Sequence, residues 1–235
     1  NGNSNCHVIH NAAKHSLRVI KYDVKTLVLK VFNEFSMSSK RVEELKECFE
    51  FVQQDFHNVL RHIPVRWLSL FNAMDRLILN WNAIKTYFIK NGKNEYDKII
   101  WKFFGGQKNE LSEQLTLSEC YIWFVHHVLS IFQKHILILE KNNLNAPEVY
   151  DVMLSLRSQI LNRKNDNFFR IAVTTRLPNL TSKESDIFKS DALNTYKRGL
   201  EYLKKWFDYE HSPFKLISCL KLSELPKLTD LLDLA

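Results

Sequence analysis

The sequence predicts an all-α protein, an irregular multi-helix bundle with at most one short strand. Apolar residues recur at spacings of three and four along most of the 235 residues, as on the buried face of an amphipathic helix. Only five glycines and five prolines occur, which is few turn-forming residues for a sheet of many strands. Two Thr-x-x-Glu sequences, at Thr116 to Glu119 and Thr181 to Glu184, have the capping-box spacing that starts helices.

The first ninety residues predict four helices. The first covers residues 6–22, and Asp23 can cap the second, which extends to Phe35. Ser38 and Ser39 separate that helix from a third one, which extends to about residue 51 and has a charged outer face. Behind Pro64, a wide apolar stripe from Trp67 to about residue 90 predicts one long buried helix.

The remainder predicts turns at residues 91–94 and 105–106, followed by further helices. The helix behind Thr116 extends to about residue 141 and is apolar on most sides, so we expect it to be the central buried helix. Pro147 opens the next helix, which ends near residue 163. Residues 168–177 are either a short strand or an extended segment before a loop. A helix from Thr181 to about residue 209 follows, and the Leu-rich tail after Pro213 forms one short helix.

The chain is basic, with 33 lysines and arginines against 26 acidic residues and a net charge of +7. Such an excess attracts nucleic acid or an acidic membrane surface. The charge is not concentrated in one block, so an ordinary basic surface is an equally valid interpretation.

The four cysteines are far apart, and a secreted disulfide framework would be denser. This pattern predicts reduced thiols in the cytosol or nucleus. The N-terminus lacks a signal-peptide pattern, and we identify no membrane-spanning stretch in the sequence. Because the chain starts without Met and stops inside a Leu-rich segment, we expect it to be an excerpt of a longer protein.

Two groups of cysteine and histidine side chains are of the types that bind metal ions. Cys6, His7 and His10 are the densest cluster of metal-ligand types; a zinc site is one interpretation, and local hydrogen bonding or packing is the other. His126 and His127 are adjacent on the apolar helix and point in different directions, so we expect one of them to be a core or boundary histidine. No common nucleotide-binding, hydrolase or metalloprotease motif occurs, and we assign no catalytic residue.

Arg66 and Trp67 are adjacent, where a loop meets the expected long helix. An arginine can hold a phosphate, and the face of a tryptophan can stack on an unpaired base. The alternative is a core tryptophan beside a surface arginine. These two residues are our candidate DNA-binding residues.

The first ninety residues resemble the hAT superfamily of DNA transposases and their domesticated relatives. The resemblance is carried by a series of short motifs in a fixed order: Cys6 to Lys14, Phe35-Ser36 with Ser38 to Arg41, Glu43 to Leu45, Phe49 to Phe51, Arg66 to Leu70, and Arg76-Leu77 with Trp81, Ala83 to Lys85 and Tyr87-Phe88. Beyond residue 106, the similarity is only a helical pattern.

The resemblance implies a transposase with a ribonuclease-H-like core that is interrupted by a large helical insertion. Residues 1–15 would be the trailing edge of that core, and residues 16–235 part of the insertion. In a complete active transposase, three carboxylates bind divalent metal ions, Mg or Mn. On this mapping none of the three lies in this chain, so the piece is not an enzyme and holds no cofactor.

By the same resemblance, Trp67 corresponds to a tryptophan that stabilises a flipped base. The sequence departs from the family at Ser4, where its Cys-x-x-His signature has cysteine, and at Val65, where threonine is usual. We therefore keep two hypotheses: a DNA-binding helical region of a transposase-like nuclear protein, or a domesticated nuclear adaptor that binds proteins. Protein partners or self-association fit either one, and no membrane is expected.

Overall fold

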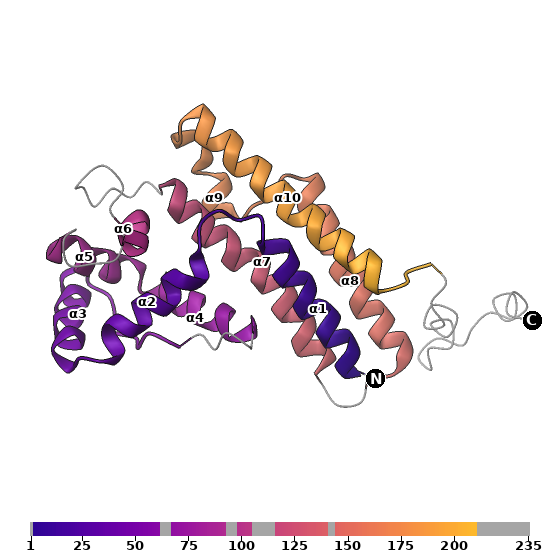
Figure 1. Cartoon of the computed structure of the whole chain (residues 1–235), viewed down its shortest axis with the longest axis horizontal. Coiled ribbons are helices and arrows are strands. Elements are labelled where there is room, and N and C mark those ends of the chain that lie inside the picture. Colours follow the sequence, from indigo (N-terminus) through magenta and orange to yellow (C-terminus); the bar gives the residue numbers. More distant parts are fainter. Residues whose placement is uncertain (1, 62–66, 93–97, 105–115, 141–143, 211–235) are drawn as a thin grey trace, which may run out of the picture. The chain divides into compact units, whose positions relative to one another are not determined.

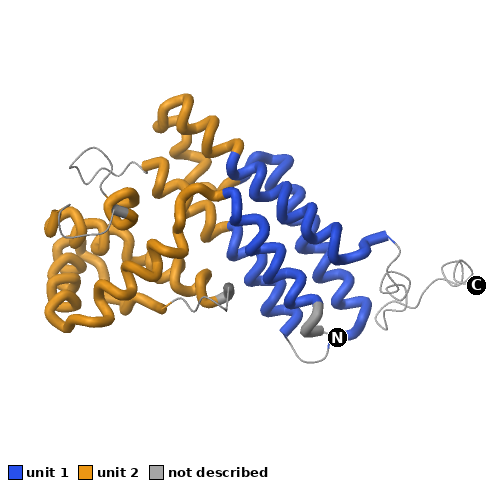
Figure 2. Tube along the Cα trace, viewed as in Figure 1, with its two compact units in different colours: residues 1–19, 128–168, 191–235 blue, residues 20–127, 169–190 orange. Residues whose placement is uncertain are grey.

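The structure is a computed structural model that describes residues 2–61, 67–92, 98–104, 116–140 and 144–210 (Figure 1). Throughout these ranges the chain is helical wherever it is regular, and they contain no strand, which confirms the predicted all-α multi-helix class. Contacts between Cα atoms divide the chain into two compact units, which are coloured separately in Figure 2.

Unit 1 consists of residues 1–19, 128–168 and 191–235 (Figure 2). Its described helices are α1 (Gly2–Leu17), the second half of α7 (Leu117–Leu139), α8 (Ala146–Asn165) and the second half of α10 (Ser182–Trp206). They pack as a small bundle around buried residues that include Ile9, Phe132 and Leu156.

Unit 2 consists of residues 20–127 and 169–190 (Figure 2). Its described elements are α2 (Val24–Ser36), α3 (Ser39–Phe51), α4 (Trp67–Leu79), α5 (Trp81–Asn91), α6 (Lys98–Phe104), the first half of α7, α9 (Ile171–Thr174), the 3-10 helix η2 (Leu177–Asn179) and the first half of α10. Its core is rich in aromatic rings, among them Phe88, Phe104, Tyr121 and Phe188, each 2% exposed or less. Large rings bury much apolar area per residue and therefore stabilise a core effectively.

The helix starts that local sequence predicts are confirmed. The side chain of Asp23 accepts a hydrogen bond from the Thr26 amide at 3.0 Å, and Ser38 accepts one from the Arg41 amide at 3.4 Å. Both predicted Thr-x-x-Glu boxes form, because the hydroxyl and the carboxylate each satisfy an amide that the first helical turn leaves unpaired. Pro147 lies in the first turn of α8, as expected.

The prediction of one long helix from Trp67 to about residue 90 is wrong in one respect. Asn80 separates α4 from α5, although the Ile84 amide still donates to the Asn80 carbonyl at 3.0 Å. Asn80 is fully buried, and its side-chain amide donates to the His57 carbonyl at 2.7 Å. The interruption therefore coincides with a polar side chain that binds the extended segment before α4.

The strand interpretation of residues 168–177 is also wrong, because this segment forms α9 and η2. The amides of Thr174 and Thr175 donate to the carbonyls four residues earlier, at 2.9 and 3.0 Å, as in a helix. Arg170 has a φ of 104°, which turns the chain sharply before α9 and prevents an extended run.

The expected burial of α7 is confirmed, since residues such as Cys120, Ile122, Phe124 and Ile136 are fully buried. Among the described helices, only Leu117–Leu139 is long and apolar enough to cross a membrane, and 56% of its apolar window is buried inside the protein. We identified no such stretch in the sequence. Burial of this kind is typical of the core helix of a globular fold, so the helix gives no support for a membrane span.

The boundary that we expect after residue 15 falls inside α1, and that division into a core edge and an insertion remains a prediction. Of the expected turns, 91–94 lies half outside and 105–106 wholly outside the described residues, and the helix expected after Pro213 also lies outside them. At the first turn, α5 ends at Asn91 and is followed by Gly92, whose φ of 82° suits a residue without a Cβ atom.

In unit 1, α10 approaches α1 very closely at Gly199. A Cβ atom added to Gly199 would lie 2.5 Å from the Ser16 hydroxyl oxygen, and Ser16 is 1% exposed. That hydroxyl donates to the Ala12 carbonyl at 2.8 Å, so it cannot move without losing its partner. Glycine therefore permits the contact between these helices.

We expect Gly199→Ala to lower the free energy of unfolding by about 1–3 kcal/mol through overpacking, although alanine has the higher helix propensity. The double variant Ser16→Ala/Gly199→Ala should recover most of this loss, because it removes the clashing oxygen. Urea unfolding followed by circular dichroism measures both. A single variant as stable as the wild type would contradict the close approach.

Candidate nucleic-acid interface

The candidate DNA-binding residues from the sequence are not placed by the structure. Arg66 lies outside the described residues, and Trp67 is described only as the first residue of α4, without its side chain. Their role therefore stays a prediction.

Cys6, His7 and His10 all lie on α1, but no group of three His, Cys, Asp or Glu side chains in the described part of the chain could hold a metal ion. Burial raises the pKa of the Cys6 thiol, and the Glu140 carboxylate raises it further, which disfavours the thiolate that binds zinc. Burial lowers the pKa of His10, while the charge of Glu140 acts in the opposite direction. The geometry of these residues therefore adds nothing to the zinc interpretation.

A cationic and aromatic surface on unit 1 is a better supported candidate. It consists of His15 in the last turn of α1, of Arg18 directly after that helix, and of Arg198, Tyr202, Lys205 and Trp206 on α10. We call it the α1–α10 face; the two helices that carry it are labelled in Figure 1. On α10 these residues have the spacing i, i+4, i+7 and i+8, which places them on one side of a helix.

Three rings of this face form a row. The ring of His15 lies 5.3 Å from that of Tyr202, and Tyr202 lies 6.0 Å from Trp206, with angles of 40° and 33° between the ring planes. Trp206 is 56% exposed, so one end of the row is open to solvent.

Cations flank the row of rings. The Arg198 guanidinium lies 3.4 Å from Nε2 of His15, and the Lys205 ammonium lies 5.4 Å from the centre of the Trp206 ring. Burial lowers the pKa of His15, and the charges of Arg198 and Arg18 lower it further, while Glu201 acts in the opposite direction. His15 is therefore neutral at pH 7, and its Nε2 can accept a hydrogen bond from Arg198.

The end of α10 is held in place by neighbouring contacts within unit 1. The Tyr150 hydroxyl donates to the Tyr209 carbonyl at 2.9 Å, Phe207 is buried, and Arg157 lies over the Tyr209 ring at 4.9 Å. Because this segment is anchored immediately behind Trp206, the exposed indole projects from a fixed helix end.

Unit 2 contains two polar clusters, which include Glu119 and His126, two residues that we singled out from the sequence. Glu119 is 2% exposed and accepts hydrogen bonds from the Trp81 indole at 2.8 Å and from the Lys85 ammonium at 2.9 Å. His126 lies between Asp75 and Arg170, at 3.2 Å from each. Both are interior or boundary packing features, and His126 confirms the expectation of a boundary histidine.

Burial lowers the pKa of His126, and Arg170 lowers it further, whereas Asp75 raises it. The stacked ring of Phe71, 4.9 Å away, contributes to the burial. This histidine is therefore held neutral and serves as a hydrogen-bonded link between α4, α7 and the start of α9.

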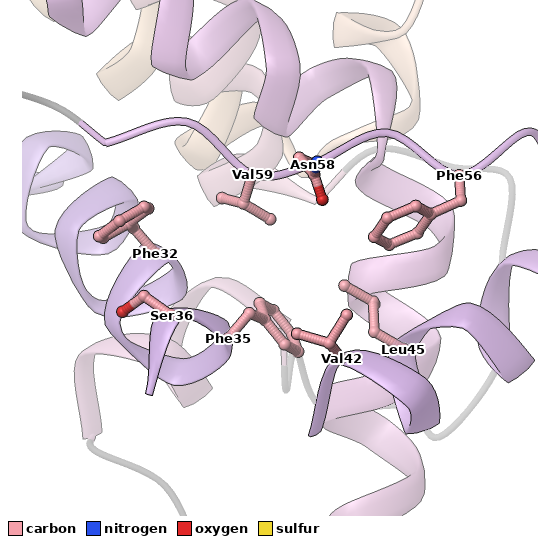
Figure 3. Close-up of a pocket in the computed structure, with 8 residues that line it drawn as sticks. All are labelled: Phe32, Phe35, Ser36, Val42, Leu45, Phe56, Asn58 and Val59. Carbon is pink, nitrogen blue, oxygen red and sulfur yellow. The ribbon is translucent and has the colours of Figure 1, made fainter. Parts of the chain in front are cut away.

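Unit 2 also has an apolar hollow of about 160 Å³ beside α2 and α3 (Figure 3). Its lining residues are Phe32, Phe35, Ser36, Val42, Leu45, Phe56, Asn58 and Val59. Figure 3 shows the rings of Phe35 and Phe56 and the side chain of Val59 directed toward its interior. Six of these eight lining residues are apolar, while Ser36 and Asn58 add polar groups, a mixture that suits the side chain of a protein partner.

Comparisons with protein-family models, with curated proteins and with solved structures found no match to this chain. A function for this chain therefore has to be inferred from its own residues and from its motif series.

Proposed function

We propose that this chain is the DNA-binding helical region of an hAT transposase-like protein that acts in the nucleus. The observation that carries the proposal is the α1–α10 face, on which three cations surround a row of rings that ends in an exposed indole. Lysine and arginine bind phosphates without regard to sequence, which suits a region that handles DNA near a catalytic core.

On this proposal the chain supplies no catalytic carboxylate and no cofactor. Divalent metal ions, Mg or Mn, would bind to the ribonuclease-H-like core of a complete active parent. The role of this region would be to hold DNA and to shape the pocket in which that chemistry takes place.

A domesticated adaptor that binds proteins is the second candidate function. The apolar hollow between Phe32, Val42 and Phe56 favours it, because such a hollow can accept an apolar side chain from a partner. The two candidates predict opposite results when the purified protein is offered DNA.

The test is binding of the full chain to labelled duplex and hairpin DNA across a salt series from 50 to 300 mM. We expect affinity to fall as salt rises, and Arg18→Gln/Lys205→Gln to reduce the slope of log K against log salt by about 1–2, since each phosphate contact contributes about 0.9. Both side chains are exposed, so their removal should leave the fold unchanged.

Lys40→Gln/Lys189→Gln is the matched control, because it removes two exposed cations from unit 2. We expect its salt slope to equal that of the wild type. Trp67→Ala, tested on the hairpin, examines the base-stacking role that the resemblance implies. A folded wild type that does not bind DNA at 50 mM salt would favour the adaptor function.

A further inference from the structure

We propose that the α1–α10 face binds unpaired nucleic-acid strands, with a base stacked on Trp206. This inference rests on the proposed function and specifies the form of nucleic acid that the face selects. Three observations support it: the exposure of Trp206, the alignment of the rings behind it, and the positions of the cations.

Trp206 is exposed although the residue next to it is buried. It is the last residue of α10, and 56% of its surface is open to solvent, whereas the next residue, Phe207, is 6% exposed. Burying an indole stabilises a protein by a large amount, and this indole instead lies open on an anchored helix end beside the cations of the same face, so its surface is available to a partner.

The ring row continues in one direction from this indole. Tyr202 lies at 33° to Trp206, and His15 lies at 40° to Tyr202, so the rings are tilted, and 56% of Trp206 stays open to solvent with the Lys205 ammonium 5.4 Å from its ring centre. A base that stacks there would extend an existing row. Stacking on aromatic side chains tolerates any base, because every base has a π-face.

Cations on the same face fit the backbone of such a strand. Arg18, Arg198 and Lys205 surround the row, and Glu201 is the one carboxylate that acts on His15 within the described residues. Glu201 is also 3.9 Å from Lys197, which partly neutralises it. Lys204 and Lys205 additionally complement the carbonyl end of α10, but that role requires no exposed tryptophan.

A duplex cannot use the indole in this way, because its bases are stacked on one another and present no free face to a side chain. The cations would bind duplex and single strand alike. A preference for unpaired strands is therefore the property that separates this inference from general DNA binding.

The test compares the full-length chain with Trp206→Ala, Trp206→Phe and Lys205→Gln by fluorescence anisotropy. The probes are a labelled 15-nucleotide oligothymidylate and a blunt duplex of equal length. We expect Trp206→Ala to weaken single-strand binding roughly 5- to 150-fold, which is the range for the loss of one stacked base, and to leave duplex binding unchanged. Trp206→Phe should restore a large part of the affinity.

The salt series distinguishes stacking from charge. Trp206→Ala removes no cation, so its salt slope should match that of the wild type, while Lys205→Gln should reduce the slope by about 0.7 on single strands. Circular dichroism and thermal unfolding of each variant verify that the helices are intact.

Equal single-strand affinity for the wild type and Trp206→Ala would overturn this inference, as would an equal loss on both probes. A wild type that binds duplex and single strand equally would also overturn it, yet would leave the proposed DNA-binding function standing. A folded wild type that binds neither the duplex nor the single strand would overturn both this inference and the proposed DNA-binding function. Polyglutamate bound as tightly as oligothymidylate, with the same dependence on Trp206, would assign the face to an acidic polypeptide instead.

Discussion

Replacing Glu119 with glutamine is expected to lower the free energy of unfolding by about 3–5 kcal/mol, because the change leaves a buried lysine without its counter-charge. Glu119 is 2% exposed at its side chain and Lys85 is 11% exposed, so water cannot replace the lost partner. The two oxygens of Glu119 accept hydrogen bonds from three groups: the Trp81 indole, the Lys85 ammonium and the Thr116 amide.

Glutamine cannot satisfy all three donors. With its oxygen toward Trp81 and Lys85, its NH₂ group faces the Thr116 amide, and in the opposite orientation the NH₂ group faces the other two. In either case, one donor points at another donor in the interior, which costs more than the loss of one hydrogen bond.

A double-mutant cycle measures the pair itself. Lys85→Met keeps the aliphatic length of the side chain and removes the charge, so Lys85→Met/Glu119→Gln should be more stable than the sum of the single changes predicts, by about 1–3 kcal/mol. Urea unfolding followed by circular dichroism gives each value.

The ion pair of Lys46 and Glu43 provides a control with a similar distance between its charged atoms. Its atoms lie 2.8 Å apart, against 2.9 Å for the buried pair, but its side chains are 42% and 67% exposed. We expect Glu43→Gln to change stability by less than about 1 kcal/mol. A Glu119→Gln variant that is equally mild would show that Lys85 reaches solvent.

Local signals predicted much of the fold. Asp23, Ser38 and the two Thr-x-x-Glu boxes bond to amides three residues away, so the sequence contains both partners within one helical turn. The burial of α7 was predictable for a similar reason, because its apolar stripe is also a local pattern that the sequence contains in full. Asn145 and Glu148 form a further capping box that we did not identify, although its spacing was equally readable.

Contacts between distant residues could not be predicted in this way. The partners Lys85 and Glu119 are 34 positions apart, and Arg198 and His15 are 183 apart. Their pairing depends on how helices pack, and many packings agree with the same periodic pattern. The break at Asn80 has the same origin, because its partner is the carbonyl of His57.

Four of the six residues of the α1–α10 face had a signal in the sequence. Arg198, Tyr202, Lys205 and Trp206 recur at helical spacing in the predicted helix from residue 181, so one cationic and aromatic side of α10 was readable. We assigned DNA binding to Arg66 and Trp67 instead, on the basis of the motif series. That His15 and Arg18 complete this surface follows only from the packing of α1 against α10.

The aromatic core of unit 2 leads to the second large effect, the truncation of Phe188. Its ring is fully buried and makes edge-to-face contacts with Tyr121, Phe124 and Phe169, at 5.1, 5.6 and 5.6 Å between ring centres. In this geometry the positive edge of one ring meets the negative face of another, which adds about 0.5–1.5 kcal/mol per pair to the burial of apolar area.

We expect Phe188→Ala to lower the free energy of unfolding by about 3–5 kcal/mol, because it removes these contacts and leaves a cavity that three other rings cannot fill. Phe188→Leu should cost less, since it keeps most of the volume and loses only the ring geometry. Chemical denaturation measures both values, and a smaller loss of stability for leucine than for alanine identifies the cavity as the main cost.

Ile187 is the natural control, because it is adjacent on the same helix and 38% exposed. Ile187→Ala changes helix propensity and side-chain size in the same direction as Phe188→Ala, so we expect it to cost less than about 1 kcal/mol. Similar losses at the two positions would mean that α10 does not bury Phe188 against α7 and the segment before α9. A large loss of stability at Phe188 alone would instead establish that this group of four rings holds the first half of α10 against the other helices of unit 2.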